Sequence, residues 1–171
     1  FMCNSSVTGL DAKSAREYPS HLAYKKKIMV PKAMHAIQRQ KQLLASALGY
    51  KTNSENTDYG ISKANFNKPL AMPSGNYAIC VQNASWITKQ WPIESWKELL
   101  KILEKRDINL LFPSGNQEEY NRANEICSVS EKALALEVLP LNEIAFLIDN
   151  SEFTLCSDTG LAHLSAVVGT P

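Results

Sequence analysis

The sequence predicts an α/β protein with a parallel sheet and helices on both faces. In residues 71–171, short apolar runs rich in β-branched and aromatic residues alternate with longer stretches of helical periodicity. The connections between them are short and polar. Repeated strand–helix units of this kind form a parallel sheet through right-handed crossovers, which place helices on both sides.

The strands and helices of this half follow in order. Tyr77–Val81 is the first apolar run and predicts a buried strand. Pro92 opens the next helix, where its missing N–H leaves no hydrogen bond unmade, and Trp96 and Leu100 lie on the apolar face. The same alternation predicts strands at 109–112, 137–139 and 153–156, and helices at 118–127, 141–150 and from about 160.

The first third differs from this pattern. Ala33–Leu48 predicts one long amphipathic helix, with Ile37, Leu44 and Leu48 facing inward and Gly49 as its C-cap. Residues 50–75 are polar and contain few large apolar side chains, which is typical of a linker. We therefore expect residues 1–70 to end one domain and residues 71–171 to begin another.

Composition excludes several classes of protein. The 171 residues are 44% hydrophobic and 20% charged with a net charge of +1, which is typical of a globular protein and not of a general nucleic-acid binder. The sequence contains no membrane-spanning apolar run and no recognisable leader. Its four cysteines form no Cys-x-x-Cys pair, which favours a reduced, cytoplasmic protein. Both ends look cut, so we expect a segment of a longer protein.

Three loops carry the residues suited to ligand binding. The first, residues 82–90, holds Asn83, Ser85 and Lys89. The second, Pro113-Ser114-Gly115-Asn116, leads to Glu119, and the third is the stretch Asp158-Thr159-Gly160, with His163 one turn inside the following helix. The carboxyl ends of parallel strands meet at one edge of a sheet, where ligands bind. Hydroxyls, a lysine and helix-start amides suit a diphosphate, and a carboxylate suits the two hydroxyls of a ribose.

Each of these residues also has a purely structural interpretation. Lys89 is compatible with a solvated surface lysine, and Asp158 and Thr159 are compatible with a simple helix cap. Glu119 suits the first turn of a helix in any case, and His163 suits a core position. Their expected convergence favours the ligand site. The sequence has no dinucleotide, Walker or zinc-protease motif and no Asp-x-Asp pair, so we expect neither a bound metal nor a tightly held cofactor.

Several stretches resemble one known family. "KQWPIESWKELLKIL" and "SDTGLAHLSAVVGTP", together with the spacing from Gly115 to Glu119, are similar to the donor domain of the bacterial lipopolysaccharide heptosyltransferases, glycosyltransferase family 9. "GLDAKSARE" and "HAIQRQKQLLASALGY" resemble the heptosyltransferase I branch of that family. The resemblance extends over nearly the whole chain.

This resemblance implies a GT-B fold, in which two Rossmann-like domains face each other. Residues 1–70 would be the C-terminal part of the acceptor domain with the interdomain linker, and residues 71–171 the first part of the donor domain. The activity it implies is inverting transfer of L-glycero-D-manno-heptose from ADP-heptose to Kdo of the lipopolysaccharide inner core. The implied partners are ADP-heptose and Kdo-lipid A, at the cytoplasmic face of the inner membrane of a Gram-negative bacterium.

The resemblance also implies residue roles in the donor site. Lys89 would stabilise the leaving diphosphate, assisted by Ser85 and by the backbone amides of Thr159 and Gly160. Glu119 would bind the ribose hydroxyls and Leu139 would flank the adenine. Asp158 and His163 would lie near the heptose.

The chain departs from the family pattern in two places. The family commonly has two hydroxyl residues before the lysine, whereas Ala84-Ser85 supplies one. The family's general base is an aspartate near the start of the acceptor domain, a region this chain does not contain, so we expect the chain alone to be inactive.

Two features of the first third suit an acidic acceptor. Arg16 is the candidate for binding it, because a guanidinium suits carboxylates and phosphates. Lys25-Lys26-Lys27 suits an anionic membrane surface, although a solvated charge run is the simpler interpretation.

Two other functions fit the same architecture. A sugar-nucleotide epimerase would prefer UDP-sugars and need no acceptor, and a non-catalytic binding module would bind nucleotide without transferring a sugar. The "GLDAKSARE" segment favours the transferase, because the resemblance assigns it to an acceptor site.

Overall fold

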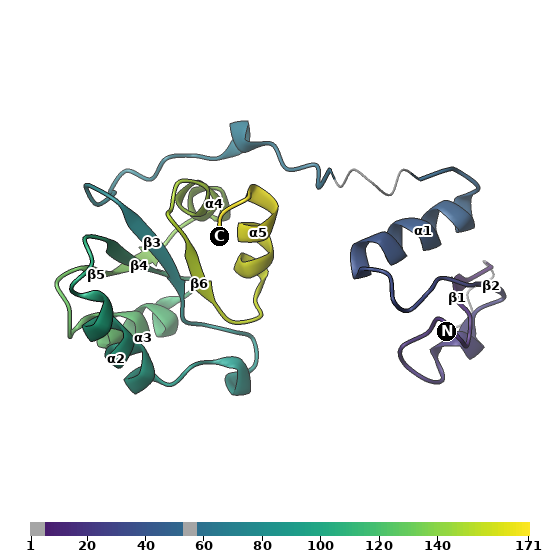
Figure 1. Ribbon diagram of the computed structural model, residues 1–171, viewed down its shortest axis with the longest axis horizontal. Coiled ribbons are helices and arrows are strands. Elements are labelled where there is room, and N and C mark those ends of the chain that lie inside the picture. The colour runs from purple at the N-terminus through teal and green to yellow at the C-terminus, as the bar shows by residue number, and fades with distance from the viewer. Residues whose placement is uncertain (1–5, 53–57) are drawn as a thin grey trace. The chain divides into compact units, whose positions relative to one another are not determined.

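The computed structural model describes residues 6–52 and 58–171, and these form two compact units (Figure 1). The first unit ends at Asp58 and the second begins at Tyr59. The sequence placed this division near residue 70. Each unit is described by itself below.

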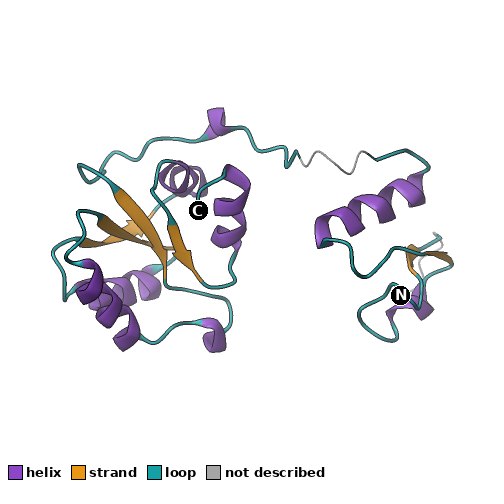
Figure 2. Ribbon diagram, viewed as in Figure 1, coloured by secondary structure: helices purple, strands orange, loops and turns teal. Residues whose placement is uncertain are grey.

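The second unit contains a four-stranded parallel sheet in the order β5-β4-β3-β6 (Figure 2). Its strands are β3 (Tyr77–Val81), β4 (Asn109–Ser114), β5 (Ala133–Val138) and β6 (Thr154–Cys156). Its α-helices are α2 (Ile93–Leu103), α3 (Gln117–Cys127), α4 (Leu141–Asp149) and α5 (Gly160–Val168). The parallel sheet predicted from the alternating pattern is confirmed.

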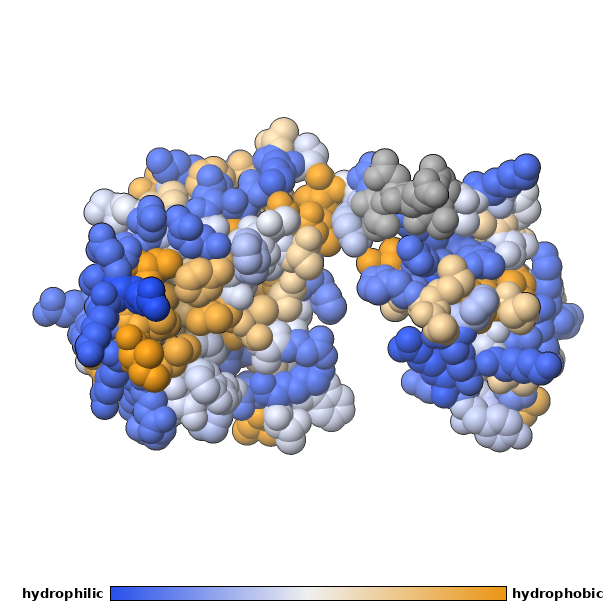
Figure 3. All heavy atoms as spheres, viewed as in Figure 1, coloured by the Kyte–Doolittle hydropathy of each residue, from blue (hydrophilic) through white to orange (hydrophobic). Residues whose placement is uncertain are grey.

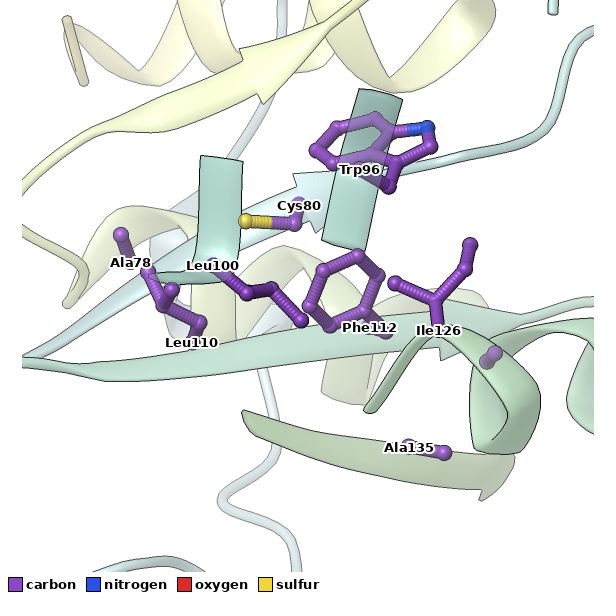
Figure 4. Close-up of a cluster of buried hydrophobic side chains, with 9 residues drawn as sticks. Ala78, Cys80, Trp96, Leu100, Leu110, Phe112, Ile126 and Ala135 are labelled. Atoms are coloured by element: carbon purple, nitrogen blue, oxygen red, sulfur yellow. The ribbon is translucent and has the colours of Figure 1, made fainter. Parts of the chain in front are cut away.

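Alternate residues of the strands point into two separate cores. On one side, Cys80 and Phe112 pack with Trp96 and Leu100 of α2 and Ile126 of α3 (Figure 4). The ring centroids of Trp96 and Phe112 lie 5.4 Å apart in an edge-on arrangement that is favourable for aromatic pairs.

The other side of the sheet has a core of its own. Ile79 and Leu111 pack there with Ile144 and Ile148 of α4, and α5 adds partly buried side chains such as Leu164. Helices α2 and α3 therefore cover one face of the sheet, and α4 and α5 cover the other (Figure 1).

One strand boundary differs from the expectation. β5 spans Ala133–Val138, whereas the sequence predicted a strand at 137–139. Leu110–Phe112 of β4 pair with Ala133–Ala135, so the first half of β5 is fixed by its neighbour. Small alanines alternate with leucines there, and a pattern that looks only for continuous large apolar residues misses them.

The segment before β3 belongs to the second unit. The short 3-10 helix η2 (Lys63–Asn65) places Lys63 Nζ 2.5 Å from Asp149 Oδ1 and 3.1 Å from the carbonyl oxygen of Val168. Asn67 N–H donates to the carbonyl of Asn142. Residues that the sequence assigned to a linker are therefore bonded to the ends of α4 and α5.

The first unit pairs β1 (Thr8–Leu10) in parallel with β2 (Lys26–Ile28) and packs α1 (Ala36–Leu48) beside them. The helix begins three residues later than predicted, and Gly49 closes it with φ 79°, as expected of a C-cap. The inward-facing residues are Arg39 and Ala45.

The prediction that Leu44 and Leu48 face inward is wrong for this unit, because they are 52% and 70% exposed. Arg39 takes the inward position instead, since its Nη2 donates to the carbonyl oxygen of Ser14 at 2.5 Å. Periodicity marks the apolar stripe of a helix, but a two-stranded sheet is too narrow to cover all of it.

Hydrophilic residues cover much of the visible surface of both units, interrupted by groups of apolar residues (Figure 3). Within the described residues, no helix is both long and apolar enough to cross a membrane.

Candidate functional site

The strand order creates a crevice at the carboxyl ends of β3 and β6. From β3 the chain continues through α2 to β4 on one side, while β6 lies on the other side of β3 and continues into α5. Because α2 and α5 lie on opposite faces, the loops that follow β3 and β6 diverge and leave space between them. Ligands of open parallel sheets bind at such switch points.

A cavity of about 540 Å³ occupies this edge of the sheet. One part of its wall is apolar and comes from Leu139, Leu141, Ile144, Leu161 and Leu164. The other part is polar or small and includes Asn83, Ser85, Ser114, Gly115, Glu119, Thr159 and Gly160. An apolar wall with a few converging polar groups is the usual character of a small-molecule site.

The turn between β6 and α5 presents the start of a helix to this cavity. Thr159 is the N-cap, and its hydroxyl accepts a hydrogen bond from the N–H of Ala162 at 3.4 Å. Gly160 is the first helical residue and has no heavy atom within 4 Å of where a Cβ would stand. The turn is therefore open, and the helix start favours an anion beside it.

Lys89 lies beside this turn in a second, smaller cavity of about 240 Å³, which shares Ser85, Thr159 and Gly160 with the first. Lys89 Nζ lies 2.6 Å from Asp158 Oδ2, and His163 Nε2 lies 3.8 Å from Asp158 Oδ1. The hydrogen bond from Lys89, and then its charge, lower the pKa of Asp158. Both side chains are exposed, so water and salt weaken this pairing.

Glu119 is held in place by the first turn of α3. The Asn116 side chain caps α3 by accepting the N–H of Glu119 at 2.9 Å. Glu119 Oε2 reaches back and accepts the N–H of Gly115, the residue before the N-cap, at 2.7 Å. A carboxylate has about four acceptor sites, so this contact leaves room for two hydroxyl donors.

The sheet arranges these groups in a row. Leu139 follows β5, Glu119 follows β4, Ser85 and Lys89 follow β3, and Asp158 follows β6. Neighbouring strands are about 4.8 Å apart, so the row extends roughly 14 Å from β5 to β6. Along the row an apolar side chain (Leu139) is followed by a carboxylate (Glu119), then by a hydroxyl and a lysine (Ser85 and Lys89), and then by the start of α5.

The structure therefore brings the sequence-predicted donor residues to two adjoining cavities. They are Ser85, Lys89, Glu119, Leu139, Asp158, Thr159, Gly160 and His163. Their individual roles stay predictions. No local sequence pattern indicates that Lys89 pairs with Asp158, because 69 residues separate them.

The first unit contains the other candidate residues, which the sequence assigned to an acceptor and a membrane surface. Arg16 is exposed at a shallow cavity of about 280 Å³ that Glu17 and Tyr24 also line. Lys25, Lys26 and Lys27 are all exposed. Their roles toward an acceptor and a membrane stay predictions. In the described ranges, no three His, Cys, Asp or Glu side chains gather as a metal site.

The sequence places Asn83 and Ser114 in two of the candidate loops without a specific role, and assigns none to Gln82. Gln82 is buried, and its Nε2 donates to the carbonyl oxygen of Glu119 at 2.8 Å, which ties the end of β3 to α3. Asn83 and Ser114 line the larger cavity. Asn83 sits in a short polar loop and Ser114 is the last residue of β4. Nothing in the local pattern assigns a role to either side chain.

The whole chain, residues 1–171, matches the family described as glycosyltransferase family 9 (heptosyltransferase). The chain belongs to that family. Lipopolysaccharide heptosyltransferase 1 of Escherichia coli strain K12 is 33% identical over 166 residues, covering 95% of this chain and 51% of the relative. The corresponding Pseudomonas aeruginosa protein is 31% identical over 171 residues, covering 100% of this chain and 48% of the relative. The chain thus spans about half the length of these curated relatives.

Two solved structures have the same fold. E. coli heptosyltransferase WaaC with ADP superposes with a TM-score of 0.79 at 30% identity, covering 97% of this chain and 53% of that one. The same enzyme with ADP-2-deoxy-2-fluoro heptose gives a TM-score of 0.78 at 30% identity, covering 97% and 52%. The predicted α/β fold of GT-B type is confirmed for this member of the family.

Proposed function

We propose that the second unit binds ADP-heptose and that the complete protein is an inverting glycosyltransferase. It would move L-glycero-D-manno-heptose onto Kdo of the lipopolysaccharide inner core. The observation that carries this proposal is the row of groups along the sheet edge, whose order matches base, ribose, diphosphate and sugar. Relatives named lipopolysaccharide heptosyltransferase 1, and a relative solved with ADP, support it.

In this arrangement the adenine lies against the apolar wall at Leu139 and the ribose hydroxyls donate to Glu119. The diphosphate lies over the start of α5, where Thr159 and Gly160 offer amides, with Ser85 and Lys89 on its other side. The heptose then lies toward Asp158 and His163.

The reaction is a direct displacement at the anomeric carbon. An acceptor hydroxyl oxygen bonds to that carbon as the bond to the diphosphate oxygen breaks, and the hydroxyl proton passes to a general base. ADP leaves with the bonding electrons, so negative charge builds on the diphosphate. Lys89 and the helix-start amides are preorganised to stabilise that charge.

The ion pair between Lys89 and Asp158 affects how the diphosphate can bind. Lys89 Nζ is already bound to Asp158 at 2.6 Å, so a diphosphate has to share the ammonium or displace the carboxylate. The displaced carboxylate can then accept hydrogen bonds from sugar hydroxyls. Arg16 would bind the acidic acceptor, and the protein would work at the cytoplasmic face of the inner membrane.

Calorimetric titration of the chain with ADP, UDP and GDP tests the donor site. We expect ADP to bind selectively and Lys89→Ala to weaken it at least about tenfold, because bonds to charged groups are strong. Lys101→Ala, an exposed lysine on α2 outside both cavities, is the matched control. In the complete enzyme, Lys89→Ala should lower turnover by about 10²–10³.

Three results would contradict the proposal. A change in turnover of less than about threefold would remove Lys89 from its role. Preference for UDP would favour the epimerase. ADP binding without heptose transfer by the complete protein would favour the binding module.

A further inference from the structure

The loop after β3, residues 82–92, carries Lys89 and is held in shape by two side-chain hydrogen bonds. Gln90 Nε2 donates to the carbonyl oxygen of Ala84 at 3.1 Å, which ties the end of the loop to its beginning. Arg122 Nη2, from α3, donates to the carbonyl oxygen of Trp91 at 2.7 Å. Lys89 lies between Ala84 and Trp91, so both hydrogen bonds restrain the backbone that carries it.

The backbone around Lys89 has little other support of its own. It forms the single 3-10 turn η3 (Ile87–Lys89), in which the N–H of Lys89 donates to the carbonyl of Trp86 at 2.9 Å. The N–H of Gln90 donates to the carbonyl of Ile87 at 3.1 Å. A 3-10 turn has poorer hydrogen-bond geometry than an α-helix. Contacts from outside the turn therefore matter for its position.

The two ends of the loop are fixed to the body of the second unit. At its start, Gln82 is buried and bonded to the carbonyl of Glu119. At its end, the ring of Trp91 meets that of buried Trp96 edge-on, with the ring centroids 5.2 Å apart. The hydrogen bonds from Gln90 and Arg122 thus connect Lys89 to a rigid frame.

Gln90 and Arg122 both act away from the proposed ligand. They lie outside the two cavities that hold the candidate donor residues, whereas Lys89 lines the smaller of the two. Gln90 faces a separate cavity of about 460 Å³, which Trp96 and Leu99 of α2 also line. Any effect of these two side chains on a bound diphosphate would therefore pass through the loop.

We propose that Gln90 and Arg122 are positioning residues, which hold the loop after β3 so that the Lys89 ammonium meets a diphosphate in one fixed place. A charge that is already in place stabilises a developing negative charge without rearranging during the reaction. A displacement of about 1 Å in such a site can be costly for the same reason. This inference rests on the proposed function, since it requires Lys89 to bind a diphosphate.

A double-mutant cycle between Gln90→Met and Lys89→Ala, measured by titration with ADP, tests the first residue. Methionine keeps the length of the side chain, removes the donor and adds no charge. Gln90→Met should weaken ADP about fivefold, the value of one neutral hydrogen bond that favours the binding conformation, and leave adenosine within twofold. In the Lys89→Ala background it should change ADP affinity less than about twofold, because the group that it positions is gone.

Arg122→Met and Arg122→Lys test the second residue. Methionine removes the donor and should weaken ADP at least about fivefold, whereas lysine keeps a donor and the charge and should bind within about twofold of the unsubstituted chain. The effect of Arg122→Met should also vanish in the Lys89→Ala background, where a direct effect of the lost charge on ADP would persist. Thr88→Val is the matched control, because Thr88 is exposed on the same loop outside both donor cavities.

The cycle also separates this inference from the proposed function. An equal loss of ADP affinity with and without Lys89 would overturn the inference, because the substitution would then act on the fold in general. If the chain binds no ADP, or if Lys89→Ala binds it unchanged, the role of Lys89 fails and the inference falls with it. If Lys89→Ala weakens ADP while Gln90→Met and Arg122→Met do not, only the inference is wrong.

Discussion

Replacing Glu119 with glutamine is the sharpest test of how the cavity recognises a ribose. Asn116 and Gly115 hold Glu119 through the first turn of α3, and its Oε2 accepts the Gly115 N–H at 2.7 Å. Glutamine has nearly the same shape and keeps one carbonyl oxygen for that contact. The substitution therefore removes the charge while preserving the turn.

The magnitude follows from the hydrogen bonds that change. With one contact occupied by Gly115, the carboxylate has acceptor sites left for both ribose hydroxyls. A hydrogen bond to a charged group contributes about 2 kcal/mol and one between neutral groups about 1 kcal/mol. Two such bonds make a difference of about 2 kcal/mol, or a loss of ADP affinity of about thirtyfold.

Calorimetric titration of Glu119→Gln with ADP and with 2′,3′-dideoxy-ADP measures this coupling directly. The dideoxy nucleotide lacks both hydroxyls, so the variant and the unsubstituted chain should bind it equally. Glu118→Gln removes a charge from the same helical turn at an exposed position outside the cavities, and should leave both affinities unchanged. A similar loss for ADP and the dideoxy nucleotide would refute a role in ribose binding, since the effect would not depend on the hydroxyls.

Two further expectations concern stability. Arg39→Met should lower the free energy of unfolding of the first unit by about 1–3 kcal/mol, because the buried Ser14 carbonyl loses its partner. Hydrogen exchange of α1 measures this loss, and equal protection in the exposed control Arg106→Met and in Arg39→Met would contradict it. Burial raises the pKa of the Cys127 thiol to about 12, and burial with the Asp149 carboxylate raises the pKa of Tyr77 to about 12. The folded chain keeps these protons while the unfolded chain loses them, so the free energy of unfolding should fall as pH rises from about 9 toward 12. Urea midpoints across that range would contradict this if they stayed constant.

Much of the second unit could be predicted from sequence, because each of its elements follows a strong local rule. A short, entirely apolar run such as Tyr77–Val81 forms a buried strand in a βα protein, and Pro92 marks where the next helix begins. The donor loops could be predicted together because parallel strands bring their carboxyl ends to one edge. Co-location of Lys89 and Thr159 followed from topology alone.

What could not be predicted depends on which groups find partners in space. The pairing of Lys89 with Asp158 is a matter of side-chain distance, which no local pattern encodes. The hydrogen bond from Arg122 to the Trp91 carbonyl likewise joins residues that are 31 positions apart. In the first unit, Arg39 faces inward and donates to the Ser14 carbonyl, while Leu44 and Leu48, which the pattern predicted to face inward, are exposed.

At the carboxyl edge of the sheet, each strand is followed by its own loop, so separate loops carry the residues of the candidate site. Leu139 follows β5, Glu119 follows β4, Lys89 follows β3, and Thr159 follows β6. In the proposed donor site the base and the ribose would therefore meet one loop each, and the diphosphate would be shared by the loops after β3 and β6. A change in the loop after β5 would alter preference for the base without disturbing the loops that hold the phosphates. A change in the loop after β6 would alter the contacts proposed for the sugar and the phosphates without replacing Leu139, the residue proposed to flank the base. In the proposed donor site, a change of base preference would therefore need changes in one loop only, while the shared core of the sheet stays the same.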